Sequence, residues 1–283
     1  RMLVTVVGWF STSTYSATDA SVARGGRWVL MPDPVRLDSG VVGAMQQRTV
    51  AVVPKVPAAD RGRVTAAIVS LTASNATRST ALTLVGDALP AGTKPRSLDL
   101  WVVPKVARAN LVVVPVGADG SIRVFSPAGN TTVATDLIGY VRSGDDEATR
   151  VGRVVPLATS FRLLDTRQAA FGAAPLGAGL TEDWSLAAFV NSVGIGSTWV
   201  GRQGAVIGSL TSVSLTVAAA SGLTVYPGVT AVAPVGPTLP TRTGAASSMP
   251  VVVRYGSSTT VRVRNAAGRA HYLFDAVAVV LAD

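Results

Sequence analysis

Short runs of alternating and β-branched apolar residues recur along the whole chain, separated by turns rich in Gly, Pro, Asn and Ser. Turn signals arrive about every eight to twelve residues, a spacing typical of β-sandwiches. No segment keeps a helical period over three turns, and the nearest candidate, residues 186–193, is short. The pattern therefore predicts an all-β protein. The runs predicted as strands are 50–53, 66–72, 81–85, 100–103, 111–116, 122–125 and 133–141, then 205–210, 213–217, 223–226, 251–254, 260–264 and 272–281.

One type of strand occurs three times, at residues 1–10, 132–141 and 271–280. Asp136 and Asp275 occupy the position that Thr5 holds in the first copy. A period of about 130 residues indicates a domain repeat. We therefore expect two tandem β-sandwich or jelly-roll-like domains. The predicted parts are residues 1–12, the closing strand of a missing preceding repeat, 13–143, the first sandwich, 144–153, a polar linker, and 154–283, the second sandwich with an insertion near 172–204.

Turn chemistry also repeats near the end of each unit. Residues 117–120 (GADG) correspond to residues 256–258 (GSS), and residues 126–129 (SPAG) correspond to residues 265–268 (NAAG). Short Gly- and Asn-containing loops between apolar runs are hairpin signals. The sequence therefore predicts equivalent closing hairpins in the two units.

The sharpest local motif is FRLLDTR at residues 161–167, with a weaker echo, VRLDSG, at residues 35–40. An Asp followed by Thr or Ser accepts hydrogen bonds from its own downstream backbone and stabilises a turn. With these residues the chain resembles the RLLDTR-type β-repeat of secreted actinobacterial proteins, which is also encountered in proteins of their phages. Units of that repeat open with the hexapeptide, carry an Asn-Leu-Val-type strand and close with Asp-x-x-Gly-Tyr-Phe.

The resemblance covers nearly the whole chain. The second unit has the complete opening motif, but Ala278 and Val279 stand where Gly and Tyr are expected. The first unit has a degenerate opening, while residues 109–115 (ANLVVVP) and 136–140 (DLIGY) follow the pattern closely. The resemblance implies a repeat-built, extracellular protein that is secreted or located on a cell surface or virion.

The acidic residues of these motifs have two interpretations. Asp165 and Asp275 could be paired catalytic carboxylates, which need a cleft and a defined separation. Alternatively, each closing-strand Asp meets an arginine of the opening motif as a structural ion pair. A pair kept in every unit is more easily explained by folding, so the structural interpretation is favoured. The residues assigned to these pairs are Arg36, Asp38, Asp136, Arg162, Asp165, Arg167 and Asp275.

Composition narrows the possible chemistry. The chain has 283 residues, of which 48% are hydrophobic and 14% charged, so compact domains are expected. It has no cysteine, and its single histidine, His271, excludes a metal site built on several histidines. No apolar run approaches the roughly 20 residues of a membrane-spanning helix. We expect no enzyme activity, no metal, no cofactor and no specific nucleic-acid partner.

The net charge of +9 and the tryptophans suggest a binding alternative. Scattered basic residues mostly indicate solvated faces, although a basic surface also attracts acidic polymers. Trp184 and Trp199 belong to the predicted insertion near 172–204 and are the candidates for stacking on a sugar. Trp101 lies inside an apolar run and is expected in the core. His271 is expected to be a partly exposed strand residue.

The favoured function is therefore a non-enzymatic extracellular structural or adhesive protein on a cell surface, a surface filament or a phage particle. The alternatives are a module that binds cell-wall polysaccharide or another acidic polymer and, third, a carboxylate-based glycan hydrolase. The partners expected are copies of the chain itself or neighbouring structural subunits. The predicted strand at residues 1–10, which we call the orphan strand, has two possible partners. It either packs on the first unit or completes a sheet in a neighbouring molecule or upstream fragment. Its apolar residues are Leu3, Val4, Val6, Val7, Trp9 and Phe10.

Overall fold

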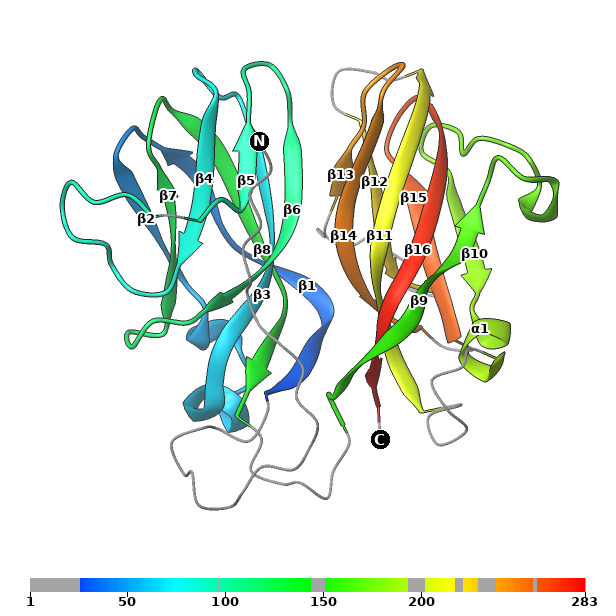
Figure 1. Ribbon diagram of the computed structural model, residues 1–283, viewed down its shortest axis with the longest axis horizontal. Helices are drawn as coiled ribbons and strands as arrows, with labels where there is room; N and C mark the ends of the chain where they lie inside the picture. Colours follow the sequence, from blue (N-terminus) through cyan, green and yellow to red (C-terminus); the bar gives the residue numbers. More distant parts are fainter. Residues whose placement is uncertain are drawn as a thin grey trace.

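The computed structural model describes residues 26–95, 97–143, 151–192, 202–216, 221–228, 238–256 and 259–282. These residues form two β-sandwiches that stand side by side (Figure 1). The prediction of an all-β chain with two sandwich domains is confirmed. The strands of the first sandwich are β1 (Arg27–Val42), β2 (Gln46–Ala51), β3 (Val64–Ser74), β4 (Thr80–Val85), β5 (Leu100–Val102), β6 (Arg108–Pro115), β7 (Ser121–Ser126) and β8 (Thr131–Arg142).

The second sandwich repeats this plan. Its strands are β9 (Val154–Asp165), β10 (Thr181–Ser185), β11 (Gln203–Thr216), β12 (Gly222–Pro227), β13 (Thr238–Pro240), β14 (Ala246–Arg254), β15 (Thr260–Asn265) and β16 (Arg269–Leu281). Short helical turns lie between strands: η1 (Val53–Lys55), η2 (Ala58–Arg63), η3 (Ala169–Phe171) and α1 (Ala187–Ser192). The helix α1 falls inside residues 186–193, the nearest helical candidate of the sequence.

Both sandwiches have the same strand order. The first pairs a β1-β8-β3-β6 sheet with a β2-β7-β4-β5 sheet, and the second pairs β9-β16-β11-β14 with β10-β15-β12-β13. Numbered within each unit, both are 1-8-3-6 facing 2-7-4-5, which is the jelly-roll arrangement of eight antiparallel strands. The sequence left open whether each unit is a plain sandwich or a jelly roll, and the strand order decides for the jelly roll.

The prediction of closing hairpins in the two units is wrong. Gly120 and Gly129 do adopt positive φ, at 76° and 65°, so these positions are turns. However, β7 pairs with β2 and β4, whereas β6 and β8 belong to the opposite sheet. In a jelly roll most consecutive strands alternate between sheets, so these turns cross from one sheet to the other instead of closing a hairpin.

Both units begin with a strand that the apolar pattern did not predict. β1 carries Pro32 and Pro34 at an irregular point of its pairing with β8, and β9 has Pro156 at a similar place. Proline is tolerated only on edge strands or at bulges, and both strands lie at a sheet edge. β10 lies inside the predicted insertion and is a regular member of its sheet, so this part of 172–204 is shared with the first unit.

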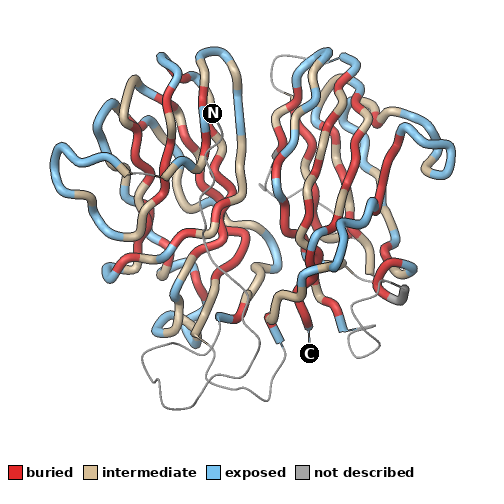
Figure 2. The backbone as a smooth tube through the Cα atoms, in the orientation of Figure 1, coloured by how far each residue is buried: buried red, intermediate tan, exposed pale blue. Residues whose placement is uncertain are grey.

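Each sandwich buries its own apolar core between its two sheets, while exposed residues lie in the loops and along parts of the edge strands such as β9 (Figure 2). A third apolar cluster joins the two sandwiches. Ile68 and Ile138 of the first unit pack with Val252 of the second, all at most 5% exposed, and Ile207 packs against them. These side chains lie on the outer faces of the 1-8-3-6 sheets. We call this contact the apolar seam.

Candidate functional site

The opening motif of the second unit ends strand β9 with a buried carboxylate. Asp165 is 1% exposed. Its Oδ1 accepts hydrogen bonds from the Arg167 backbone N–H at 3.1 Å and from Arg167 Nε at 2.8 Å. Its Oδ2 accepts bonds from Arg167 Nη2 at 2.8 Å and Gln168 Nε2 at 3.1 Å. The backbone bond is the one expected of an Asp that stabilises its own turn.

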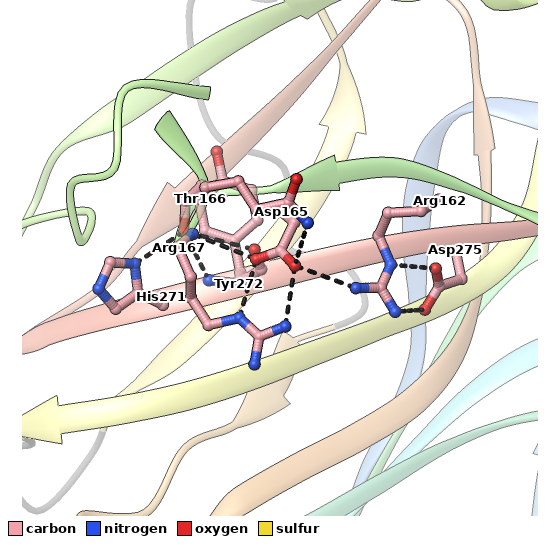
Figure 3. Close-up of polar contacts among 8 residues, drawn as sticks. Arg162, Asp165, Thr166, Arg167, His271, Tyr272 and Asp275 are labelled. Carbon is pink, nitrogen blue, oxygen red and sulfur yellow. Dashed lines mark hydrogen bonds and ion pairs between the residues drawn. The ribbon is translucent and has the colours of Figure 1, made fainter. Parts of the chain in front are cut away.

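Arg162 links this carboxylate to a second one on the neighbouring strand (Figure 3). Its Nη1 lies 3.1 Å from Asp165 Oδ2, while its Nε and Nη2 both contact the Asp275 carboxylate, the latter at 3.1 Å. Arg162 and Asp275 are directly opposite in the β9–β16 pairing. Together Arg162, Asp165, Arg167 and Asp275 form what we call the acid–arginine cluster.

The electrostatics of the cluster favour the ionised form of Asp165. The Arg167 guanidinium holds the pKa of Asp165 well below its usual range, against the opposing effect of burial. Asp275 shares Arg162 with Asp165. Because its pKa is lowered, Asp165 is not available as a proton donor at neutral pH. A general acid needs a raised pKa instead. The arrangement is that of a structural network, with the two carboxylates bridged by one guanidinium.

The first unit has a simpler version of this cluster. Arg36 lies opposite Asp136 in the β1–β8 pairing and binds its carboxylate through Nε and through Nη2, the latter at 3.3 Å. Asp136 is 2% exposed, and burial raises its pKa more than Arg36 lowers it. The structure therefore brings together both Arg–Asp pairs that the sequence analysis names.

Asp38 does not occupy the position of Asp165. In both units a register shift follows the paired arginine, at Arg36 in β1 and at Arg162 in β9. After that shift, Asp38 lies opposite Thr135, the place that Leu164 takes in the second unit. Asp38 binds Arg48 of β2, whose Nη2 lies 2.8 Å from Oδ1, and this guanidinium lowers the pKa of Asp38. The two motifs are therefore similar in amino-acid sequence, but Asp38 and Asp165 occupy different positions in the strand pairing.

Thr166 and His271 have structural hydrogen bonds. The Thr166 hydroxyl is 3.2 Å from His271 Nδ1 and accepts the Tyr272 backbone N–H at 3.0 Å. Thr166 is 1% exposed. This hydroxyl ties the end of β9 to the start of β16 (Figure 3), and His271 is half-buried on β16. Their placement suits a turn anchor, with the hydroxyl held away from solvent.

Trp184 is not an exposed platform for a sugar. It is half-buried against the core of the second sandwich, and its ring meets Phe171 edge-on with centroids 5.8 Å apart. Its Nε1 donates a hydrogen bond to the Tyr272 hydroxyl at 2.5 Å. On β10, Glu182 and Trp184 alternate with exposed neighbours, so the strand turns this tryptophan inward.

Two further predictions fall outside the described residues. Trp199 is one of them. The other is the orphan strand, whose apolar residues from Leu3 to Phe10 also lie there.

Among the tryptophans that the structure describes, Trp101 is the exposed one, contrary to its expected place in the core. In β5, Leu100 and Val102 are buried while Trp101 between them is 49% exposed. The sequence does not reveal this alternation of buried and exposed positions, because the residue that points outward is itself apolar. Trp101 lines a cavity of about 330 Å³ between the two sandwiches. We call it the inter-sandwich cavity.

The inter-sandwich cavity lies where β5 and β6 of the first unit face β13 and β14 of the second. Its volume falls in the lower part of the range found for ligand pockets. The side chains that carry charge or hydrogen-bonding groups there are Asp99, Arg108, Asn110, Arg242, Ser247 and Ser248. Burial raises the pKa of Asp99, although the Leu84 backbone N–H donates to its carboxylate at 2.7 Å.

The described residues contain no group of three or more His, Cys, Asp or Glu side chains placed to hold a metal ion. Within the same residues, no helix has both the length and the apolar character needed to cross a membrane.

No protein-family model and no curated protein matches the chain. Among solved structures, it is similar to the Macrobrachium rosenbergii nodavirus structure over 99% of this chain and 97% of that one, at 7% identity and a TM-score of 0.24. It is also similar to the N-terminal tandem CBM22 domain from Paenibacillus barcinonensis, over 91% and 93% of the two chains, at 10% identity and a TM-score of 0.20. These scores assign no family, so the function rests on the residues themselves.

Proposed function

We propose that this chain is a non-enzymatic extracellular structural or adhesive protein, displayed on a cell surface, a surface filament or a phage particle. The observation that supports it most is the apolar seam. Ile68, Ile138 and Val252 are buried between two jelly rolls of the same strand order. Apolar burial of this kind holds two modules at a fixed angle, which suits a structural or spacing element.

The acid–arginine cluster supports the non-enzymatic part of the proposal. Asp165 receives four hydrogen bonds from Arg167 and Gln168, and Arg162 joins it to Asp275. Carboxylates engaged in this way are held by arginine and stabilise the start of the repeat. The resemblance to the RLLDTR-type repeat supports the same conclusion, because a motif that recurs in each unit is more easily explained by a role in folding than by catalysis.

Assembly by strand addition is part of the proposal. Within the described residues, β2 and β10 are edge strands that pair on one side in unbroken register. The edges β1 and β9 carry prolines and register shifts, which discourage an added strand. The edges β6 and β14 contact each other between the two sandwiches, so they are less open to an added strand. We propose that residues 1–10 of one molecule pair with the β2 or β10 edge of another.

The test is electron microscopy and light scattering of the full chain and of a Val4→Pro/Val6→Pro variant. Proline cannot donate to a strand ladder, so the variant loses assembly if residues 1–10 are the added strand. Thr14→Pro, outside that segment, is the matched control and assembles like the unsubstituted chain. Filaments that persist unchanged in Val4→Pro/Val6→Pro rule out strand addition, and a monomer under all conditions counts against the structural role.

The second candidate function is binding of cell-wall polysaccharide. The observation that favours it is Trp101, exposed at the wall of the inter-sandwich cavity. Aromatic faces beside hydrogen-bonding groups are suited to sugar rings. Co-sedimentation of soluble chain with purified cell walls supports this candidate, and recovery of all the protein in the supernatant excludes it.

A further inference from the structure

The inter-sandwich cavity exists only where the two units meet. The first unit contributes residues 99–101 and 106–110, and the second contributes Leu239, Pro240, Arg242 and residues 246–248. Neither jelly roll could form this site alone. A ligand bound there would contact both units at once.

The cavity carries two arginines that differ from those of the acid–arginine cluster. Arg108 and Arg242 are both exposed, and within the described residues neither has a carboxylate at ion-pair distance. Arg36 and Arg162, by contrast, are each engaged by an aspartate. A guanidinium left free at a cavity wall can bind a carboxylate or phosphate with two parallel hydrogen bonds.

The carboxylate that lines the cavity, Asp99, is held by groups of its own unit. Asp99 Oδ2 accepts the Leu84 N–H at 2.7 Å, and the Asp99 carbonyl accepts a bond from Asn110 Nδ2 at 2.7 Å. Asp99 is therefore fixed in place without an arginine partner in the described part of the chain. Its carboxylate can accept hydrogen bonds from hydroxyl groups, which sugars provide in number.

The wall on the second unit carries hydroxyl groups. Ser248 Oγ lies 2.8 Å from Ser209 Oγ and accepts a bond from Thr211 Oγ1 at 3.0 Å, and Ser247 and Ser248 both line the cavity. Trp101 lies on the wall contributed by the first unit. An aromatic ring, hydroxyls and two cations around one hollow match a sugar that bears negative charge.

We propose that the inter-sandwich cavity binds a segment of an anionic glycan, with Arg108 and Arg242 on its acidic groups and Trp101 against a sugar ring. Asp99, Ser247 and Ser248 take its hydroxyls. The proposal rests on the second candidate function and locates it in the cavity, away from Trp184. Carboxylate sugars and phosphate-linked sugar polymers share this chemistry.

The experiment is isothermal titration of the full chain with an oligogalacturonide, with a poly(glycerol phosphate) and with a neutral maltooligosaccharide of matched length. The variants are Trp101→Ala and Arg108→Gln/Arg242→Gln. Arg202→Gln is the matched control, because Arg202 is exposed at the opposite end of β11 from the residues that face Ser248. Circular dichroism shows that each variant remains folded.

We expect one of the two anionic probes to bind and the neutral probe to bind at least about tenfold more weakly. Loss of charged hydrogen bonds should weaken binding by Arg108→Gln/Arg242→Gln at least about tenfold. Loss of the aromatic contact should weaken binding by Trp101→Ala by a similar factor, while binding by Arg202→Gln is unchanged. High salt should also weaken binding. The anionic probe that binds identifies the carboxylate or the phosphate source.

Three results overturn the proposal in different ways. If an anionic probe binds but the cavity variants and Arg202→Gln behave alike, the cavity is the wrong site and the second candidate function stands. If neither anionic probe binds, the ligand class is wrong, and co-sedimentation with whole cell walls then shows whether the second candidate fails as well. Equal binding of the neutral probe also contradicts a role for Arg108 and Arg242.

Discussion

The two jelly rolls share their strand order but present the same position to different surroundings. Strands β8 and β16 both skip one residue in their pairing, at Ile138 in the first unit and at Val277 in the second. Ile138 is 5% exposed in the apolar seam, whereas Val277 is 45% exposed. The fold therefore sets the position of the bulge. Packing between the units determines whether the side chain at the bulge is buried or exposed.

The acidic positions differ in a related way. The first unit binds Asp136 with one arginine, while the second adds Asp165, Arg167 and Gln168 around the shared Arg162. Because both units reach the same topology, the larger cluster is not needed to specify the jelly roll. Its expected role is to stabilise the second unit.

The largest expected effect comes from placing a charge in the apolar seam. Ile138→Asp buries a carboxylate without a partner. This should reduce the free energy of docking between the two units by about 3–5 kcal/mol. Differential scanning calorimetry should show the two units unfolding separately or at a clearly lower temperature. Val277→Asp, at the equivalent exposed position, should change stability by no more than about 0.5 kcal/mol. Equal losses in the two variants would contradict the assigned seam.

The next effect is expected in the acid–arginine cluster. Asp165→Asn removes a buried charge that orders Arg162 and Arg167, and it should cost about 2 kcal/mol in urea unfolding. Asp38→Asn in the first unit removes one partly exposed ion pair with Arg48 and should cost less than about 1 kcal/mol. If the Asp38 variant loses as much as the Asp165 variant, the greater stabilising role of the second-unit cluster is refuted.

A smaller effect separates Gly139 from its counterpart Ala278. A Cβ on Gly139 would lie 2.6 Å from the Val29 carbonyl oxygen, whereas Ala278 is accommodated in the second unit. Gly139→Ala should destabilise by about 1–3 kcal/mol through overpacking, and Ala278→Gly by about 0.5–1 kcal/mol through backbone entropy. Thermal unfolding of both variants measures the difference, and a stabilised Gly139→Ala would mean that β1 approaches β8 less closely.

The smallest effect is a pH dependence of opposite sign in the two units. Asp136 has a raised pKa, so the folded chain takes up a proton before the unfolded chain does, and stability relative to Asp136→Asn should rise as the pH falls toward about 4. Asp165 has a lowered pKa, so its advantage over Asp165→Asn should be constant above about pH 4 and shrink below it. Urea unfolding at several pH values compares them, and parallel pH profiles would contradict the assignment.

Several parts of this structure could be predicted from the sequence. The alternating apolar runs fixed the all-β class because a half-buried strand needs a period of two. The repeat of Asp136 and Asp275 located the closing strands, and the arginines of the opening motifs lie opposite those aspartates. These signals are local or follow the repeat directly.

Other parts depend on contacts between distant residues. The edge strand β1 contains prolines that conceal its pattern, and turns of hairpin type join opposite sheets. Trp101 and Trp184 exchanged their expected roles, because which face of a strand points inward depends on the opposite sheet. The inter-sandwich cavity could not be predicted, since it is formed by residues of two units that meet only after folding.

The central claim is that the apolar seam docks the two jelly rolls in one fixed arrangement. The chain has no cysteine, so Lys105→Cys and Thr243→Cys place one spin label on each unit. Both sites are exposed, and they adjoin Val106 and Arg242, which line the inter-sandwich cavity. Pulsed electron spin resonance should give a single narrow distance distribution, which broadens when Ile138→Asp is added. A broad distribution in the doubly labelled chain, unchanged by Ile138→Asp, would contradict the docked pair.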